Sequence, residues 1–185
     1  MNKAVFLDRD GVINRAASEG KYIVRWEEMY VLPGVAEAIR LLNTSGFLVI
    51  VVTNQRCVAK GLITVEDLEI MHQKMCGELA ATGAMINKVY YCPHDMEPPC
   101  SCRKPGPGML LEAARDHDVT LYESWMIGDS TSDVEAGINA GCKTARVIRS
   151  HRLSGDSSGV SAPSLLGIVR QIVGSGKRTQ TDNTR

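Results

Sequence analysis

Short apolar runs alternate with amphipathic helical patterns along most of this chain. Runs of this kind occupy residues 4–7, 47–52, 89–91, 125–127 and 143–148. Apolar residues recur at helical spacing in segments 35–42, 64–82, 108–116, 132–140 and 165–173. Strands that alternate with helices pair in parallel through right-handed crossovers. The sequence therefore predicts an α/β fold built on a doubly wound parallel sheet.

Residues typical of helix ends support two of these helices. Thr64, with Asp67 three residues later, is similar to a capping box and predicts a helix that runs to about Thr82. Ser132 is expected to cap the helix at 132–140, and Gly141 is expected to end it.

Composition is that of an ordinary soluble globular protein. The chain has 185 residues, of which 44% are hydrophobic and 23% are charged. This length suits one domain with a sizeable core. We expect that domain to cover residues 1–173, and the polar segment 174–185 to be a disordered tail.

Charge and hydropathy disfavour several classes of partner. The 21 basic and 21 acidic side chains leave no net charge to suggest binding to nucleic acid or to a membrane. The N-terminus has no apolar segment with a cleavage site, and no run approaches about 18 apolar residues. The sequence predicts a cytoplasmic protein, and a monomer because no exposed apolar repeat indicates an interface.

Polar side chains gather where the predicted strands end. Asp8 and Asp10 follow the first apolar run, and in an extended segment they point the same way while Arg9 points elsewhere. Further polar residues follow at later strand or loop ends: Thr53 and Asn54, Arg103 and Lys104, and Asp129 with Asp133 behind it. Ligands of open α/β sheets bind beyond the carboxyl ends of the strands, so one crevice is expected to hold all of these residues.

This set of residue types indicates phosphoryl transfer. Asp8, Asp10 and Asp129 form an all-oxygen environment that suits Mg²⁺, which commonly takes one or two carboxylates, phosphate and water. Each of these residues taken alone could instead have a purely structural role, as a solvated loop residue or a strand-end cap. The cationic and hydrogen-bonding groups that a phosphoryl group needs would come from Thr53, Arg103 and Lys104.

These residues resemble the four motifs of the haloacid dehalogenase superfamily of aspartate-nucleophile phosphatases, in order and over residues 4–148. The motifs are Asp8-Arg9-Asp10-Gly11-Val12, then Thr53, then Lys104, then Gly128-Asp129 through Asp133. The resemblance implies that Asp8 attacks phosphorus to form an aspartyl-phosphate. It implies that Asp10 protonates the leaving oxygen and then activates water, a role that needs a neutral Asp10 when the substrate arrives.

The resemblance also implies the binding groups. Thr53 and Lys104 would bind the phosphoryl oxygens, and Asp133 would bind a metal-bound water or orient Lys104. The ligands of Mg²⁺ would be Asp8, the backbone carbonyl of Asp10, and Asp129.

A second set of metal ligands lies in one short loop. Cys92-Pro93-His94 and Cys100-Ser101-Cys102 together offer three thiols and an imidazole. Such a set completes a tetrahedral Zn²⁺ site with no position left for water, as structural zinc sites do. We therefore expect a zinc loop over residues 92–104, bound through Cys92, His94, Cys100 and Cys102, with free thiols in a reducing compartment as the alternative. The remaining cysteines are expected to be core or helix residues: Cys57, Cys76 and Cys142.

The cysteine loop and the Arg103-Lys104-Pro105 that follows resemble one capless branch of the superfamily, whose members act on a heptose bisphosphate or on histidinol phosphate. Segments 15–32, 56–63 and the zinc loop would replace the cap. The resemblance favours removal of the 7-phosphate of D-glycero-D-manno-heptose 1,7-bisphosphate, a step toward ADP- or GDP-heptose precursors. Arg103 and Lys60 would then hold the second phosphate.

Other readings stay open at this point. The resembled loop has a small residue and glycine where this chain has Arg56-Cys57, which leaves the sugar and its anomer undecided. Histidinol phosphate is the alternative substrate, because acidic residues of the first insert would suit its amine. A phosphatase of nucleic-acid 3′ ends is disfavoured by zero net charge and few aromatic residues. A zinc-stabilised binding protein without activity is the alternative from another class.

Overall fold

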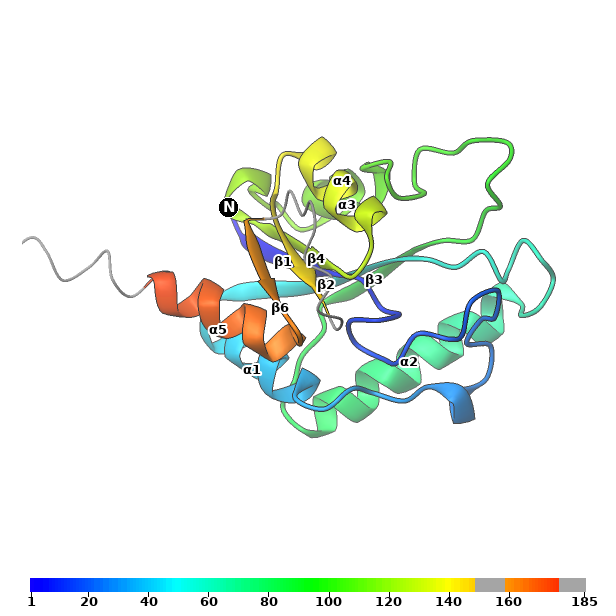
Figure 1. Ribbon diagram of the computed structural model, residues 1–185, viewed down its shortest axis with the longest axis horizontal. Helices are drawn as coiled ribbons and strands as arrows, with labels where there is room; N and C mark the ends of the chain where they lie inside the picture. Colours follow the sequence, from blue (N-terminus) through cyan, green and yellow to red (C-terminus); the bar gives the residue numbers. More distant parts are fainter. Residues whose placement is uncertain (149–158, 177–185) are drawn as a thin grey trace, which may run out of the picture.

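The computed structural model describes residues 1–148 and 159–176 and has a single parallel sheet at its centre (Figure 1). The sheet has six strands in the order β3-β2-β1-β4-β5-β6, and every neighbouring pair is parallel. This confirms the predicted doubly wound sheet. The strands are β1 (Lys3–Leu7), β2 (Phe47–Asn54), β3 (Lys88–Cys92), β4 (Trp125–Gly128), β5 (Lys143–Val147) and β6 (Val160–Ala162).

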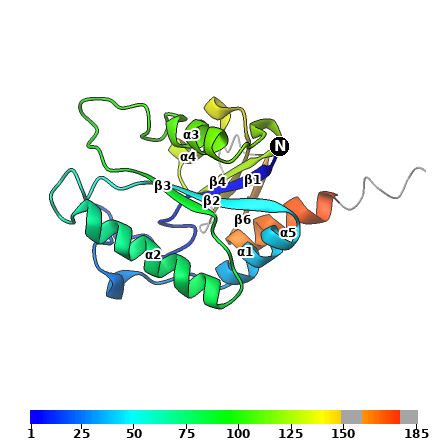
Figure 2. The same cartoon turned by 180° about the vertical axis from the view of Figure 1, so that it is seen from behind.

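Helices cover both faces of the sheet. In Figures 1 and 2, α3 and α4 lie on one side of the strands, and α1, α2 and α5 lie on the other. Two short 3-10 turns, η1 (Trp26–Glu28) and η2 (Leu121–Glu123), lie in connecting segments. The helices are α1 (Val35–Thr44), α2 (Val65–Ala81), α3 (Gly108–Asp116), α4 (Thr131–Ala140) and α5 (Leu165–Gly176).

Side chains of the central strands alternate between two apolar cores. In β1, Val5 and Leu7 belong to the core under α1, α2 and α5, whereas Ala4 and Phe6 belong to the core under α3 and α4. All four are fully buried. A strand that is buried on both faces has no polar side, which explains its continuous apolar run.

The structure corrects several predicted boundaries. Ser130, not Ser132, caps α4: its hydroxyl accepts from the backbone N–H of Asp133, whose carboxylate accepts from the N–H of Ser130. This reciprocal pair is a capping box, and it starts the helix at Thr131. Strand β6 was not expected, because a three-residue strand carries almost no pattern.

The chain end also differs from expectation. Helix α5 continues to Gly176, so residues 174–176 are helical and are not part of a disordered tail. The rest of the predicted tail, 177–185, lies outside the described residues.

Loops replace a cap domain in the part of the chain that the structure describes. Segment 15–32 contains η1, a turn, a bend and the isolated bridge of Val31 with Asn14, and segment 56–63 consists of turns and bends. Within the described ranges, no helix has the length and apolar character needed to cross a membrane.

Candidate active site

The carboxyl ends of β1, β2 and β4 meet at the centre of the sheet. Leu7 pairs with Val51 on one side and with Ile127 on the other, so Asp8 emerges between the ends of both neighbouring strands. Asp129 directly follows β4. The parallel register therefore brings together residues that are about 120 positions apart in sequence.

Lys104 lies at the centre of the site and is almost completely buried. Its ammonium contacts Asp8 Oδ1 at 2.7 Å and Asp133 Oδ1 at 2.6 Å, and it donates to the carbonyl of Val52 at 2.8 Å. The Lys104 and Asp133 side chains are each 2% exposed, and that of Asp8 is 12% exposed. A buried charge is costly unless it is paired and hydrogen-bonded, and these contacts satisfy that requirement for Lys104.

The pKa values of Asp8 and Asp133 are shifted in opposite directions by their surroundings. Burial raises the pKa of Asp8 to about 7; the positive charge of Lys104 opposes this shift and the charge of Asp133 adds to it. For Asp133, burial favours the neutral form, but Lys104 and the hydrogen bonds from Ser130 outweigh it and lower the pKa. Burial also opposes the charge of Lys104, yet Asp8 and Asp133 together raise its pKa. Asp8 is thus the carboxyl whose charge depends most on what binds beside it.

Three carboxylates are close enough together to hold a cation. Asp8, Asp129 and Asp133 each offer an oxygen, and these atoms lie within 4.8 Å of one another. Gly11 permits this approach: it has a φ of +86°, and a Cβ atom there would lie 1.8 Å from Asp129 Oδ2. An all-oxygen set of this kind fits Mg²⁺.

Asp10 does not join this carboxylate group, contrary to the expected Asp8, Asp10 and Asp129 set. Strand β1 ends at Leu7, so the alternation of an extended strand does not govern residues 8–10. Arg9 does not point away either, because its Nη2 donates to both carboxylate oxygens of Asp10, at 3.0 and 2.8 Å. The role expected for the backbone carbonyl of Asp10 stays a prediction.

Three further donors hold the Asp10 carboxylate in place. Asn14 Nδ2 donates to Oδ1 at 2.8 Å, Gln55 Nε2 donates to Oδ2 at 3.1 Å, and Arg9 Nε donates to Oδ1 at 3.2 Å. Burial disfavours the charged form, but the Arg9 charge and the bonds from Asn14, Arg9 and Gln55 outweigh it and lower the pKa of Asp10. In this state the surroundings favour an ionised Asp10, not the neutral acid that was expected on substrate arrival.

Several of these supporting residues were missed by sequence reasoning. Gln55 is buried and also donates to Thr53 Oγ1 at 2.8 Å, and the buried Cys57 thiol donates to Gln55 Oε1 at 3.5 Å. Cys57 is thus the core residue that was expected, and it packs under Gln55. The sequence does give a signal for Gln55, because it is a polar residue directly after the strand-end pair Thr53-Asn54.

Thr53 and Asn54 lie where the sequence placed them. Thr53 is 1% exposed at the end of β2. Asn54 exchanges two bonds with the backbone of Lys104, donating to its carbonyl and accepting from its N–H, both at 3.1 Å. This pair fixes the Lys104 loop to the central sheet.

A cavity of about 510 Å³ lies next to this loop. Arg103 is half-buried at its wall, where its Nη1 also donates to the carbonyl of His94 at 3.4 Å. Lys60, the other cation expected to hold a second phosphate, is exposed and does not line the cavity. Residues of both polar and apolar type form the wall, among them Asn54, Met96, Pro99, Arg103, Lys104 and Ser132.

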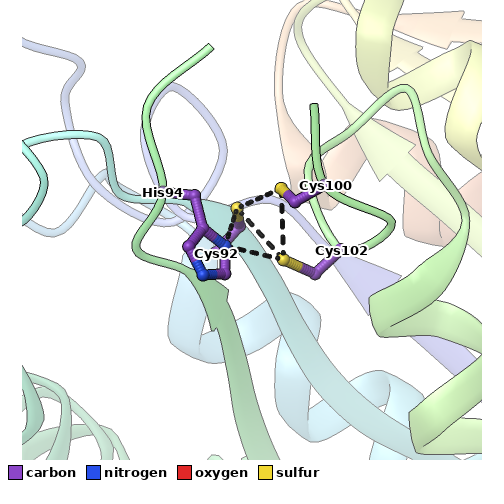
Figure 3. A group of neighbouring side chains, drawn as sticks. All are labelled: Cys92, His94, Cys100 and Cys102. Carbon is purple, nitrogen blue, oxygen red and sulfur yellow. Dashed lines mark hydrogen bonds between the residues drawn. The ribbon is translucent and has the colours of Figure 1, made fainter. Parts of the chain in front are cut away.

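The cysteine loop brings its four expected ligands together (Figure 3). The Sγ atoms of Cys92, Cys100 and Cys102 and Nδ1 of His94 lie within 4.8 Å of one another, with contacts of 3.2 to 3.6 Å. Sulfur ligands of a tetrahedral zinc ion with Zn–S bonds of about 2.3 Å are about 3.8 Å apart, and shorter Zn–N bonds bring a nitrogen ligand closer. The arrangement therefore fits zinc, and it directs Nδ1 of His94 inward.

An ion pair joins this loop to the loop after β2. Arg56 Nε contacts Asp95 Oδ1 at 2.5 Å, and the two side chains are 30% and 35% exposed. Arg56, which departs from the resembled pattern, thus connects segment 56–63 with the loop between Cys92 and Cys100.

The sheet order and the buried strand-end charges define a hydrolase of the haloacid dehalogenase type. A family profile described as HAD-hydrolase-like matches residues 101–157. A solved structure of D,D-heptose 1,7-bisphosphate phosphatase from B. bronchiseptica, complexed with magnesium and phosphate, has a TM-score of 0.85 at 32% identity, and the match covers 94% of this chain and 99% of that one.

Curated relatives identify one family within this class of hydrolases. The D-glycero-beta-D-manno-heptose-1,7-bisphosphate 7-phosphatase of Rhodopseudomonas palustris is 44% identical over 145 residues, which are 75% of this chain and 79% of the relative. The D-glycero-alpha-D-manno-heptose-1,7-bisphosphate 7-phosphatase of Mycobacterium bovis is 39% identical over 156 residues, covering 84% and 81%. This chain belongs to the heptose-1,7-bisphosphate 7-phosphatase family of HAD-like hydrolases.

Proposed function

We propose that this protein hydrolyses the 7-phosphate of D-glycero-D-manno-heptose 1,7-bisphosphate through an aspartyl-phosphate on Asp8. The observation that carries the proposal is the buried cluster in which Lys104 contacts both Asp8 and Asp133. A permanent cation beside a strand-end carboxylate stabilises the negative charge that develops there during phosphoryl transfer. The names of the relatives support the heptose bisphosphate as the substrate.

Asp8 is the proposed nucleophile. A carboxylate oxygen of Asp8 forms a bond to phosphorus while the bond from phosphorus to the sugar oxygen breaks, which divides one slow displacement into two easier ones. Lys104 offsets the charge of the phosphoryl oxygens, and Thr53 and Asn54 lie at the neighbouring strand end.

Asp10 is the proposed acid and base. It gives a proton to the departing sugar oxygen and then takes one from the water that attacks the aspartyl-phosphate, which releases inorganic phosphate and restores Asp8. An approaching phosphate dianion raises the pKa of a nearby carboxyl, so substrate binding opposes the Arg9 charge and favours the protonated form of Asp10. After the first step, Arg9, Asn14 and Gln55 stabilise the ionised form that acts as the base.

Two metals are part of the proposal. Asp8 and Asp129, with the backbone carbonyl of Asp10, would hold Mg²⁺, and Asp133, which contacts Lys104, would orient it. Bound Mg²⁺ neutralises phosphoryl charge and favours the ionised form of Asp8. Zn²⁺ would be held by Cys92, His94, Cys100 and Cys102, and it would fix the loop that ends in Arg103 and Lys104.

Arg103 is the proposed contact for the second phosphate of the substrate. It lies on the wall of the cavity that includes Lys104, and a guanidinium binds phosphate oxygens in pairs. Lys60 would need to move to reach the same cavity, because it is exposed outside the wall.

The test is phosphate release from a panel of substrates with Mg²⁺ present. The panel contains both anomers of the heptose 1,7-bisphosphate, fructose 1,6-bisphosphate and histidinol phosphate, each with the wild type and with Asp8→Asn. We expect highest kcat/KM for one heptose anomer and no turnover by Asp8→Asn. Best turnover of histidinol phosphate would move the assignment to that substrate, and a folded protein that hydrolyses none of them would favour a binding role.

A further inference from the structure

We infer that His72 is a positioning residue for the proposed reaction, because it holds the buried Arg9 guanidinium that orients Asp10. The inference rests on the proposed function of this site. It concerns a residue of α2 that has no place in the sequence motifs.

Arg9 is enclosed and is paired on two sides. It has no solvent exposure, and its Nε and Nη2 donate to Asp10. Its remaining nitrogen, Nη1, lies 3.0 Å from Nε2 of His72. His72 belongs to α2 and is itself 4% exposed.

The chemistry of the pair fixes the protonation of His72. Arginine has only donors, so Nε2 of His72 accepts this hydrogen bond and the proton of the neutral ring is on Nδ1. Burial lowers the pKa of His72 to about 3, and the charge of Arg9 adds to the shift. His72 is therefore a neutral acceptor, and the ring of Tyr91 packs against it at 5.7 Å between centroids.

This contact has a mechanical consequence for Asp10. The Nε and Nη2 atoms of Arg9 are hydrogen-bonded to Asp10, and Nη1 is hydrogen-bonded to His72. These contacts on both sides keep the guanidinium in one orientation. Without the His72 acceptor, Nη1 becomes a buried donor with one acceptor fewer. Because an unsatisfied buried donor is costly, the guanidinium is expected to move toward another acceptor. Asp10 then loses the alignment with the departing oxygen and the attacking water, and small misplacements of catalytic groups reduce rates strongly.

The decisive variants are His72→Leu and His72→Gln. Leucine fills similar space without an acceptor, whereas the Oε1 of glutamine reaches the position of Nε2 and accepts from Arg9. We expect His72→Leu to lower kcat on the best substrate by about tenfold or more, with KM within about twofold, because Lys104 and Arg103 are untouched. His72→Gln should recover most of the loss. The matched control is His117→Leu, a half-buried histidine at the end of α3, which should behave as wild type.

A second measurement separates positioning from general damage. On the same folded variants, kcat/KM is compared for an alkyl phosphate and for p-nitrophenyl phosphate, whose leaving group needs little protonation by Asp10. We expect His72→Leu to lower kcat/KM for the alkyl ester much more than for the aryl ester. Equal losses for both esters, or His72→Leu with wild-type kcat, would overturn the inference. If His72→Leu does not fold, Arg9→Lys replaces it, since it removes the paired donors and should show the same dependence on the leaving group.

Failure of this inference is distinct from failure of the proposed function. A wild type that hydrolyses no phosphate ester contradicts the proposed function itself. An active wild type with unaffected His72→Leu contradicts only the role of His72.

Discussion

Two ligand clusters at the same end of the sheet are assembled in opposite ways. Asp8 and Lys104 are 96 residues apart and meet because β1, β2 and β4 end side by side over a buried core. Cys92 and Cys102 are only 10 residues apart in sequence. Cys92 ends β3 and is buried, whereas His94 in the loop that follows is exposed. We expect the first cluster to depend on the fold, and the second to depend also on the zinc ion proposed for it. Removal of one member should therefore have different consequences in the two places.

The largest effect is expected for Lys104→Met. This change leaves Asp8 and Asp133 buried without their shared cation, and breaking a buried ion pair from one side costs about 3–5 kcal/mol. Urea unfolding should show a loss of this size, and phosphate release should fall by about a thousandfold or more. The control is Lys88→Met, where the lysine is exposed at the start of β3 and both quantities should stay near wild type. A stable and active Lys104→Met protein would show that the cluster is not essential.

The next effect concerns the zinc loop. Metal analysis should give about one zinc per chain, and Cys100→Ser should reduce it strongly because a four-ligand site loses one member. We expect at least a tenfold loss of activity, since Arg103 and Lys104 follow the loop directly, while far-UV circular dichroism stays unchanged. Cys142→Ser is the matched control, because that cysteine lies outside the cluster. Loss of the whole fold on chelation would contradict the contrast between the two clusters.

A third prediction concerns the pH dependence of stability. The pKa of His72 is about 3 in the folded protein, below its ordinary value of 6.5. Between these values the unfolded chain binds a proton that the folded chain does not, so the contribution of His72 is complete above pH 6.5 and is lost as the pH falls. The slope is about 1.4 kcal/mol per pH unit. His72→Gln should therefore reduce the loss of unfolding free energy from pH 6.5 to 5 by about 2 kcal/mol. Parallel curves for the variant and the wild type would contradict the neutral buried state of His72.

The smallest effect is expected for the partly exposed ion pair between Arg56 and Asp95. Arg56→Ala removes the contact with Asp95, and exposed ion pairs contribute little. The thermal midpoint should stay nearly unchanged, and kcat/KM should fall by less than about fivefold. Asp95→Ala should match it, and the double variant should lose no more than either single one. Losses that add would show that the two residues act separately.

The sequence predicts the elements of this fold well where their signal is long or continuous. Runs such as Phe47–Val52 have no polar face because helices cover both sides of the sheet, and the predicted parallel sheet is confirmed. The cap at Ser130 was misplaced by two residues, since Ser130 and Ser132 both precede helical residues and only the geometry of Asp133 separates them. Strand β6 has too few residues for a pattern.

Some residues of the candidate site could be predicted from the sequence and others could not. Residues at strand ends or within one loop were found because spacing in sequence translates directly into proximity there. The contact between Arg9 and Asp10 was not, because it forms beyond the end of β1, where the chain is no longer extended. His72 looks like any histidine on the buried face of a helix, and its partner lies 63 residues away. Tertiary structure alone reveals it.

The role of Asp8 as the nucleophile is tested most directly by finding the phosphoryl group on its side chain. The wild type is mixed with its best substrate and Mg²⁺, quenched in acid within the first turnover and treated with borohydride, which reduces an aspartyl-phosphate to homoserine. Peptide mass spectrometry should then find homoserine at position 8 and unchanged aspartate at positions 10, 129 and 133. Turnover that continues with Asp8 unmodified at every quench time, or homoserine at another position, would contradict the aspartyl-phosphate on Asp8.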